Sequence, residues 1–129
     1  EDPCVVRATA GDGAKLVYFH GHFDVVPAQR RDQFVPQRRD GRITGRGTAD
    51  MKGGLVSMIY GAAAARALGL LGDARVVLHF VCDEETGSAA GSGHLRDAEL
   101  IDPGAAAMVR PSPPAAWSGT RVAVRSRCG

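Results

Sequence analysis

The feature that most constrains this fold is a continuous apolar segment, residues 74–82, that ends abruptly in Asp83-Glu84-Glu85. Such runs are typical of strands that a parallel sheet buries on both faces. Before it, Gly53-Gly54 opens a helical segment with little polar surface, and Gly69 is its expected C-terminal cap. We expect this helix to pack deep against a sheet.

The other segments extend this pair into an α/β fold with a mostly parallel sheet flanked by helices. Two strands joined by Gly11-Asp12-Gly13 are expected first, the second ending before Pro27. We expect a polar loop over residues 28–47, a short helix over 88–100, and strands at 105–109 and 121–125. Functional groups in such sheets gather past the carboxyl ends of the strands.

Charge and hydropathy exclude several classes of protein. The formal net charge of +2 is too small to indicate a nucleic-acid binder, and the purely apolar runs are too short to cross a membrane. The loop over residues 28–47 holds six arginines, which could bind phosphate. A solvated loop is the better interpretation, because no series of aromatic residues accompanies them.

The cysteines favour a reducing compartment. Cys4, Cys82 and Cys128 are odd in number and widely spaced, so we expect no disulfide, and Cys82 as a buried, inert thiol. This favours a cytoplasmic location. The chain begins without Met or a signal region, which predicts an internal or processed piece.

Three short motifs carry the chemistry. His22 and Asp24 share one face of an extended strand, as suits a metal ligand and the carboxylate that orients it, although a core histidine paired with Asp24 is an alternative. Asp50 lies just ahead of the helix in a glycine-rich segment that fits neither a dinucleotide fingerprint nor a Walker A loop, and a plain N-cap is its alternative role.

The acidic segment Asp83-Glu84-Glu85 is the most specific of the three. Adjacent carboxylates repel one another unless a cation lies among them, so a divalent metal with one carboxylate left as a base is favoured over a solvated acidic turn. Imidazole and carboxylate donors without thiolates suit Zn, Mn or Co in a hydrolytic site.

These motifs carry a resemblance to a known family. LVYFHGHFDVVP (residues 16–27), DGRITGRGTADMKGG (40–54) and VCDEETG (81–87) occur in this order across nearly the whole chain. They resemble the dizinc amidohydrolases that include acetylornithine deacetylase, succinyl-diaminopimelate desuccinylase, aminoacylase and carboxypeptidase G. The resemblance implies that residues 1–129 are a partial catalytic domain, without the lid and dimerisation domain.

The resemblance also implies a role for each residue. His22 is similar to a ligand of one metal, Asp50 to the carboxylate that bridges two metals before a cis peptide, and Glu85 to a ligand of the other metal. Asp24 is similar to the catalytic-site carboxylate that holds the His22 ligand in its orientation. Glu84 is similar to the general base. This base takes a proton from the water that bridges the two metals, which leaves a metal-bridging hydroxide, and later donates the proton to the leaving amine. The implied cofactors are two divalent ions, most often Zn, with Co or Mn as alternatives.

The implied reaction is hydrolysis of an amide bond in an N-acyl amino acid or small peptide. The implied partners are that substrate and, for a full-length form, a second copy in a homodimer, with no nucleic acid and no membrane.

Two departures from the family pattern favour an alternative. Ser112 stands where a further carboxylate ligand is expected, and Asp102 does not fit as its replacement. The last histidine ligand of the family has no match either, since neither His79 nor His94 fits that role. Each metal then keeps two protein ligands. The alternative function is an inactive fragment or pseudoenzyme that serves at most as a binding module. We expect the isolated chain to bind metal weakly and to turn over little or nothing, and the complete gene product to be a hydrolase.

Overall fold

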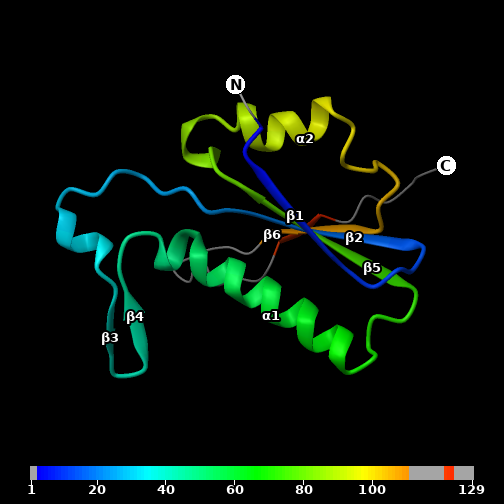
Figure 1. Cartoon of the computed structure of the whole chain (residues 1–129), viewed down its shortest axis with the longest axis horizontal. Helices are drawn as coiled ribbons and strands as arrows, with labels where there is room; N and C mark the ends of the chain where they lie inside the picture. The colour runs from blue at the N-terminus through cyan, green and yellow to red at the C-terminus, as the bar shows by residue number, and fades with distance from the viewer. Residues whose placement is uncertain (1–2, 111–120, 124–129) are drawn as a thin grey trace.

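The fold is a sheet between two helical layers. The computed structural model describes residues 3–110 and 121–123. Helix α1 (Gly53–Ala67) lies against one face of the sheet, and α2 (His94–Asp97), which continues the turn Ala89–Gly93, lies on the other (Figure 1). The predicted α/β class is confirmed.

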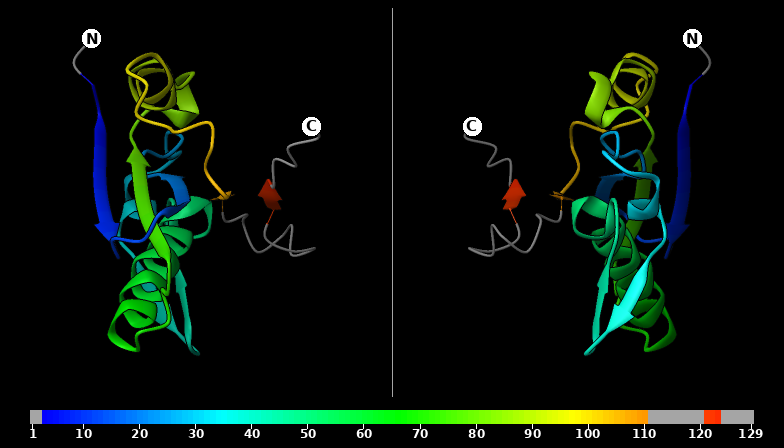
Figure 2. Two further views of the ribbon diagram at one scale, coloured as in Figure 1. Left: turned by 90° about the vertical axis from the view of Figure 1, so that its right-hand side faces the viewer. Right: turned by 90° about the vertical axis from the view of Figure 1, so that its left-hand side faces the viewer.

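The sheet has five strands in the order β1-β5-β2-β6-β7, with β1 at one margin and β7 at the other (Figure 2). Their bounds are β1 Val5–Ala10, β2 Lys15–His22, β5 Ala74–Val81, β6 Ala107–Arg110 and β7 Arg121–Ala123. Strand β2 pairs parallel with β5 and β6, whereas the pairs β1–β5 and β6–β7 are antiparallel. The parallel pairings therefore form the centre of a mixed sheet.

The first two strands are connected through Gly11-Asp12-Gly13, as predicted, but they do not pair with each other, because β5 lies between them in the sheet. Strand β5 buries side chains on both faces, so a central position with partners on both edges removes most apolar surface from water. The predicted second strand is also shorter, since β2 ends at His22 rather than before Pro27.

The main core lies between the sheet and α1. It is formed by Ala10, Met51, Leu55, Met58, Ala62, Val76 and Leu78. Gly21 lets α1 approach β2 closely, because a Cβ there would lie 2.6 Å from Leu55 Cδ2. Gly69 has a φ of +66°, which confirms it as the residue that ends the helix. The helix buries one face only, whereas Val56, Ile59 and Tyr60 are exposed, so the expected deep burial is wrong for the described residues.

The segment predicted as a polar loop contains regular structure. A single turn of 3-10 helix at Arg31–Phe34 precedes a hairpin of β3 (Gln37–Arg39) and β4 (Arg42–Thr44). Every residue of both strands is exposed, so no alternation of apolar and polar residues indicates them. Arg30 pairs with Asp32 at 2.8 Å on the same exposed surface.

Cys4 and Cys82 form a disulfide with their Cα atoms 5.7 Å apart, so the predictions of no disulfide and of an inert Cys82 thiol are wrong. The cause is the antiparallel register of β1 on β5, which pairs Val5 with Val81 and so brings Cys4 to Cys82. The cysteines therefore give no support to a reducing compartment. Cys128 lies outside the described residues. None of the helices in residues 3–110 and 121–123 has the length and hydropathy to span a bilayer.

His79 is buried on the α2 side of the sheet between β1 and β2. Arg7 Nε donates a hydrogen bond to its Nε2 at 3.1 Å, and the ring of Tyr18 stacks on it at 5.0 Å between centroids. Burial, followed by the charges of Arg7 and His20, lowers the pKa of His79 to about 4. The predicted role of His79 as a strand residue outside the active site agrees with this position.

Loss of the disulfide will lower the free energy of unfolding. The bond joins residues 78 apart, and closing a loop of that length is worth about 4 kcal/mol through restriction of the unfolded chain. We expect Cys4→Ser to lower the urea midpoint accordingly, while Cys128→Ser leaves it unchanged. Equal midpoints for Cys4→Ser and the wild type would contradict the pairing.

His79 will make stability depend on pH. The unfolded chain takes up this proton near pH 6.5 but the folded chain only near pH 4, so stability is present above pH 6.5 and is lost as pH falls toward 4. The loss is up to about 3 kcal/mol. Urea unfolding at pH 7.0, 6.0 and 5.0 should show a shallower pH slope for His79→Gln than for the wild type. The partly exposed His94→Gln variant is the control, and an unchanged slope for His79→Gln would refute this assignment.

Candidate metal centre

The candidate site lies where β2 and β5 end side by side. The two strands are parallel and in register from Lys15 opposite Ala74 to His22 opposite Val81. The segments that follow, with Asp24 on one and Glu84 and Glu85 on the other, therefore leave the sheet at the same edge. This confirms the expectation that ionisable residues gather past the carboxyl ends of these strands.

His22 is the centre of the cluster and is 1% exposed. Its Nδ1 lies 3.2 Å from Asp24 Oδ1 and 3.2 Å from the Asp24 carbonyl oxygen. Its Nε2 lies 3.1 Å from Asp50 Oδ1 and 3.9 Å from Glu84 Oε2. The alternative of a core histidine satisfied by Asp24 accounts for one ring nitrogen and leaves the other facing two carboxylates.

Asp50 reaches His22 from the turn that precedes α1. The turn follows Gly47, whose φ of +78° is left-handed, and contains a cis peptide between Asp50 and Met51, as the family resemblance implies. Met51 is 2% exposed and anchors the turn in the core. Lys52 donates a hydrogen bond from Nζ to the Phe23 carbonyl at 2.7 Å, which ties the turn to the end of β2. A plain N-cap is excluded, because no side chain caps α1.

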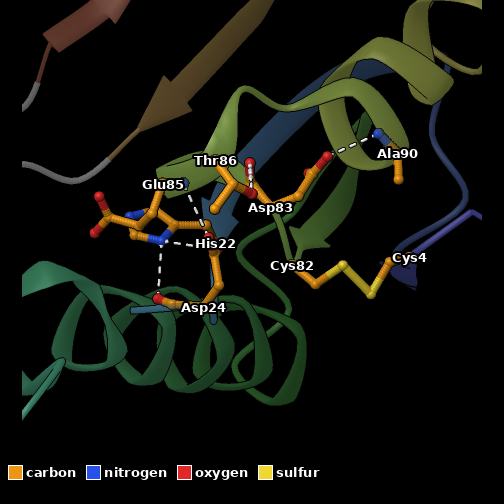
Figure 3. The surroundings of a disulfide bond; sticks show 8 residues. All are labelled: Cys4, His22, Asp24, Cys82, Asp83, Glu85, Thr86 and Ala90. Carbon is orange, nitrogen blue, oxygen red and sulfur yellow. Dashed lines mark hydrogen bonds and ion pairs between the residues drawn. A yellow bond between two sulfur atoms is a disulfide. The ribbon is translucent and has the colours of Figure 1, made fainter. Parts of the chain in front are cut away.

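The acidic segment divides between two directions (Figure 3). Asp83 points to the turn Ala89–Gly93 that precedes α2, where its Oδ2 accepts the Ala90 amide hydrogen at 2.7 Å. One carboxylate oxygen of Glu84, one of Glu85 and one ring nitrogen of His22 all lie within 4.8 Å of one another. The Glu85 amide donates to Asp24 Oδ2 at 2.9 Å, so Asp24 connects the two segments. Only two of the three carboxylates therefore face the site.

The donors fit a divalent cation. If Asp24 accepts the Nδ1 proton of a neutral His22, the Nε2 lone pair faces the oxygens of Asp50 and Glu84, which is repulsive unless a cation lies among them. One imidazole and three carboxylates form an N/O set that suits Zn, Co or Mn. The side chain of Asp50 is 52% exposed, so this edge is open to solvent.

The structure brings together all five residues predicted from the sequence: His22, Asp24, Asp50, Glu84 and Glu85. Glu84, which the resemblance implies to be the general base, belongs with His22 and Glu85 to the group of side chains that could hold a metal ion. Ser112 falls outside the described residues. Asp102 is exposed before β6, with its Oδ1 bonded to the Gly104 amide at 2.7 Å, and His94 begins α2, so neither joins the cluster.

Sequence reasoning missed Lys52 and Met51, which position Asp50. Both directly follow Asp50 in the glycine-rich motif, but the sequence alone does not show that Phe23 and the core are their partners. It also gave Asp83 a place in the site, whereas Asp83 holds the Ala90 amide. The acidic run leaves a strand and enters a single turn of 3-10 helix at Glu84–Thr86, and so short a run has no periodicity from which the directions of its side chains could be predicted.

The sequence profile of peptidase family M20/M25/M40 matches residues 18–124. A succinyl-diaminopimelate desuccinylase of Burkholderia vietnamiensis is 37% identical over 103 residues, which cover 76% of this chain and 27% of the relative. The chain thus spans about a quarter of the length of this curated relative.

Two solved structures share the fold. Human carnosine dipeptidase 1 has a TM-score of 0.67 and 28% identity, and the match covers 84% of this chain and 25% of that one. The dipeptidase Dug1p of Saccharomyces cerevisiae has a TM-score of 0.68 and 27% identity, with the same coverage.

His22 should be the dominant metal ligand of this centre. We expect His22→Ala to abolish zinc binding in isothermal titration and Asp24→Asn to weaken it about 10- to 100-fold, because Asp24 orients the imidazole. His94→Ala, on α2 outside the cluster, is the matched control and should bind as the wild type does. Undiminished zinc binding by His22→Ala would place the metal elsewhere.

Proposed function

This chain belongs to peptidase family M20/M25/M40, and on that premise we propose that residues 1–129 are part of the catalytic domain of a metal-dependent hydrolase that cleaves amide bonds. The observation that carries the proposal is the convergence of His22, Asp50, Glu84 and Glu85 at one edge of the sheet. Hydrolysis by carboxylates and one imidazole with a divalent metal is the chemistry this donor set suits best.

We propose two divalent ions as cofactors, most often zinc, with cobalt or manganese as substitutes. His22 and Asp50 would hold one ion, and Asp50 and Glu85 the other. When bound, such ions supply Lewis acidity toward a carbonyl oxygen and lower the pKa of a coordinated water. Asp24 keeps the His22 proton on Nδ1, so that Nε2 is free to act as the ligand.

Glu84 is the proposed general base. It lies at the same edge as the proposed ligands, with Oε2 3.9 Å from His22 Nε2, and its side chain is 29% exposed. From there its carboxylate can accept a proton from water and then donate that proton to the leaving amine. Asp50 is more open to solvent than His22, so the substrate is proposed to approach from the Asp50 side.

The proposed substrate is an N-acyl amino acid or a small peptide. The named relatives support this class, since one is a succinyl-diaminopimelate desuccinylase and two are dipeptidases. Both substrate types present an amide bond next to a carboxylate-bearing amino acid. A cytoplasmic location stays a proposal that the Cys4–Cys82 disulfide does not support, and a homodimer is proposed for a full-length form.

The experiment that tests this function is hydrolysis of an N-succinyl amino acid and of a dipeptide by a zinc-loaded full-length form, because the isolated chain is expected to bind metal weakly. We expect Glu84→Gln to retain zinc and to lose about 10²- to 10⁴-fold in rate, because the amide cannot take the proton. Glu99→Gln, an exposed glutamate after α2, is the matched control and should keep the wild-type rate. Removal of zinc with a chelator should abolish the activity of the wild type and of Glu99→Gln.

Two other results have distinct meanings. Zinc binding with no turnover in the wild type would support the alternative, a chain that retains the fold as a binding module. Hydrolysis that survives both chelation and Glu84→Gln would refute the proposed function.

A further inference from the structure

The Cys4–Cys82 disulfide lies one residue ahead of the acidic segment. Cys82 follows Val81, which is fully buried at the end of β5 and whose carbonyl accepts the Phe23 amide hydrogen at 2.9 Å. Position 82 is therefore where a rigid strand becomes the segment that carries Glu84 and Glu85. A covalent bond at this point acts directly on the start of that segment.

The other half of the disulfide holds the far end of the same segment. The Cys4 amide donates to the Ala90 carbonyl at 3.2 Å, and the Ala90 amide donates to Asp83 Oδ2 at 2.7 Å. Cys4, Asp83 and Ala90 thus close residues 83–90 into a loop, with the disulfide beside it (Figure 3). We call residues 83–90 the acidic loop.

Strand β1, which supplies Cys4, is the margin of the sheet, and within the described residues its strand partner is β5 alone. When the disulfide is reduced, the first residues of β1 are held by the end of its hydrogen-bond ladder with β5, where strands fray most easily. If Cys4 moves, its hydrogen bond to Ala90 is lost, and the acidic loop loses an anchor.

Movement of the acidic loop would reach the metal centre through one contact. The Glu85 amide donates to Asp24 Oδ2, and the other oxygen of Asp24 lies 3.2 Å from His22 Nδ1. A shift of Glu85 therefore alters both the position of its own carboxylate and the group that orients His22. Cys4 and Cys82 are both partly exposed, so a reductant can reach them.

We propose that the Cys4–Cys82 pair is a redox modification site that positions the acidic loop, so that a dithiol reductant releases the loop and weakens the metal centre. The metal part of this inference rests on the proposed function, whereas the coupling of the disulfide to the loop does not.

The reaction balances with a dithiol as the second reactant. One thiolate of the dithiol attacks a sulfur of the pair, the S–S bond breaks, and a mixed disulfide forms with release of one cysteine thiolate. The second thiol of the reagent displaces the other cysteine and forms a disulfide within the reagent. Two electrons and two protons pass to Cys4 and Cys82, and the dithiol is oxidised.

The first experiment observes the loop without metal. In a Cys128→Ser background, which prevents exchange with the third cysteine, amide NMR spectra are compared before and after reduction with dithiothreitol. We expect the Glu85 and Ala90 signals to move, because both amides donate to carboxylates, and the signals of Met58 and Ala62 in α1 to stay in place. The matched control, Cys4→Ser with Cys128→Ser, should show the reduced spectrum with or without dithiothreitol.

The second experiment measures zinc affinity by titration after the reductant has been removed under argon. We expect reduction to weaken zinc binding about tenfold, as for loss of a contact that orients a ligand. The control double variant should bind weakly in both conditions.

Three results would be decisive. Unmoved Glu85 and Ala90 signals would overturn the coupling of the disulfide to the acidic loop. The same conclusion would follow if the amide signals of α1 moved as far as those of Glu85 and Ala90. Moved loop signals with equal zinc affinity in the two states would overturn the link to the metal centre. Moved loop signals with no zinc binding in either state would uphold the redox site and refute the proposed metal function.

Discussion

The parallel pairing of β2 with β5 is the constraint on which the site depends. It sets His22 opposite Val81, so the segments that follow both strands begin at the same edge of the sheet. In an antiparallel pairing these segments would leave at opposite edges, and Asp24 could not accept the Glu85 amide hydrogen.

Burial of His22 gives the edge its chemical character. A fully enclosed imidazole holds its ring in one orientation, with Nδ1 toward Asp24 and Nε2 toward Asp50 and Glu84. The carboxylates around it are more exposed, so their charges are partly solvated while the imidazole is not. The arrangement is a buried nitrogen donor beside partly exposed oxygen donors, which fits the proposed metal centre.

Much of the site could be predicted from local sequence. The period of two along an extended segment predicted that His22 and Asp24 lie together, and the structure brings them together although β2 itself ends at His22. An abrupt change from apolar to acidic residues marked the end of β5. The fold class followed from the order of elements. The hairpin β3–β4 could not be predicted, since all its residues are exposed and carry no apolar period. Whether Asp83 faces the site also depended on Ala90, which belongs to the next element.

The sequence by itself determined the donor types, their order along the chain and the parallel centre of the sheet, because strand periodicity and residue chemistry are local properties. Only the tertiary structure decided the neighbours of each strand, and with them the Cys4–Cys82 bond and the approach of Asp50 to His22. Strand order depends on how much apolar surface each competing arrangement buries. That quantity belongs to the packed molecule, and no short segment of the chain contains it.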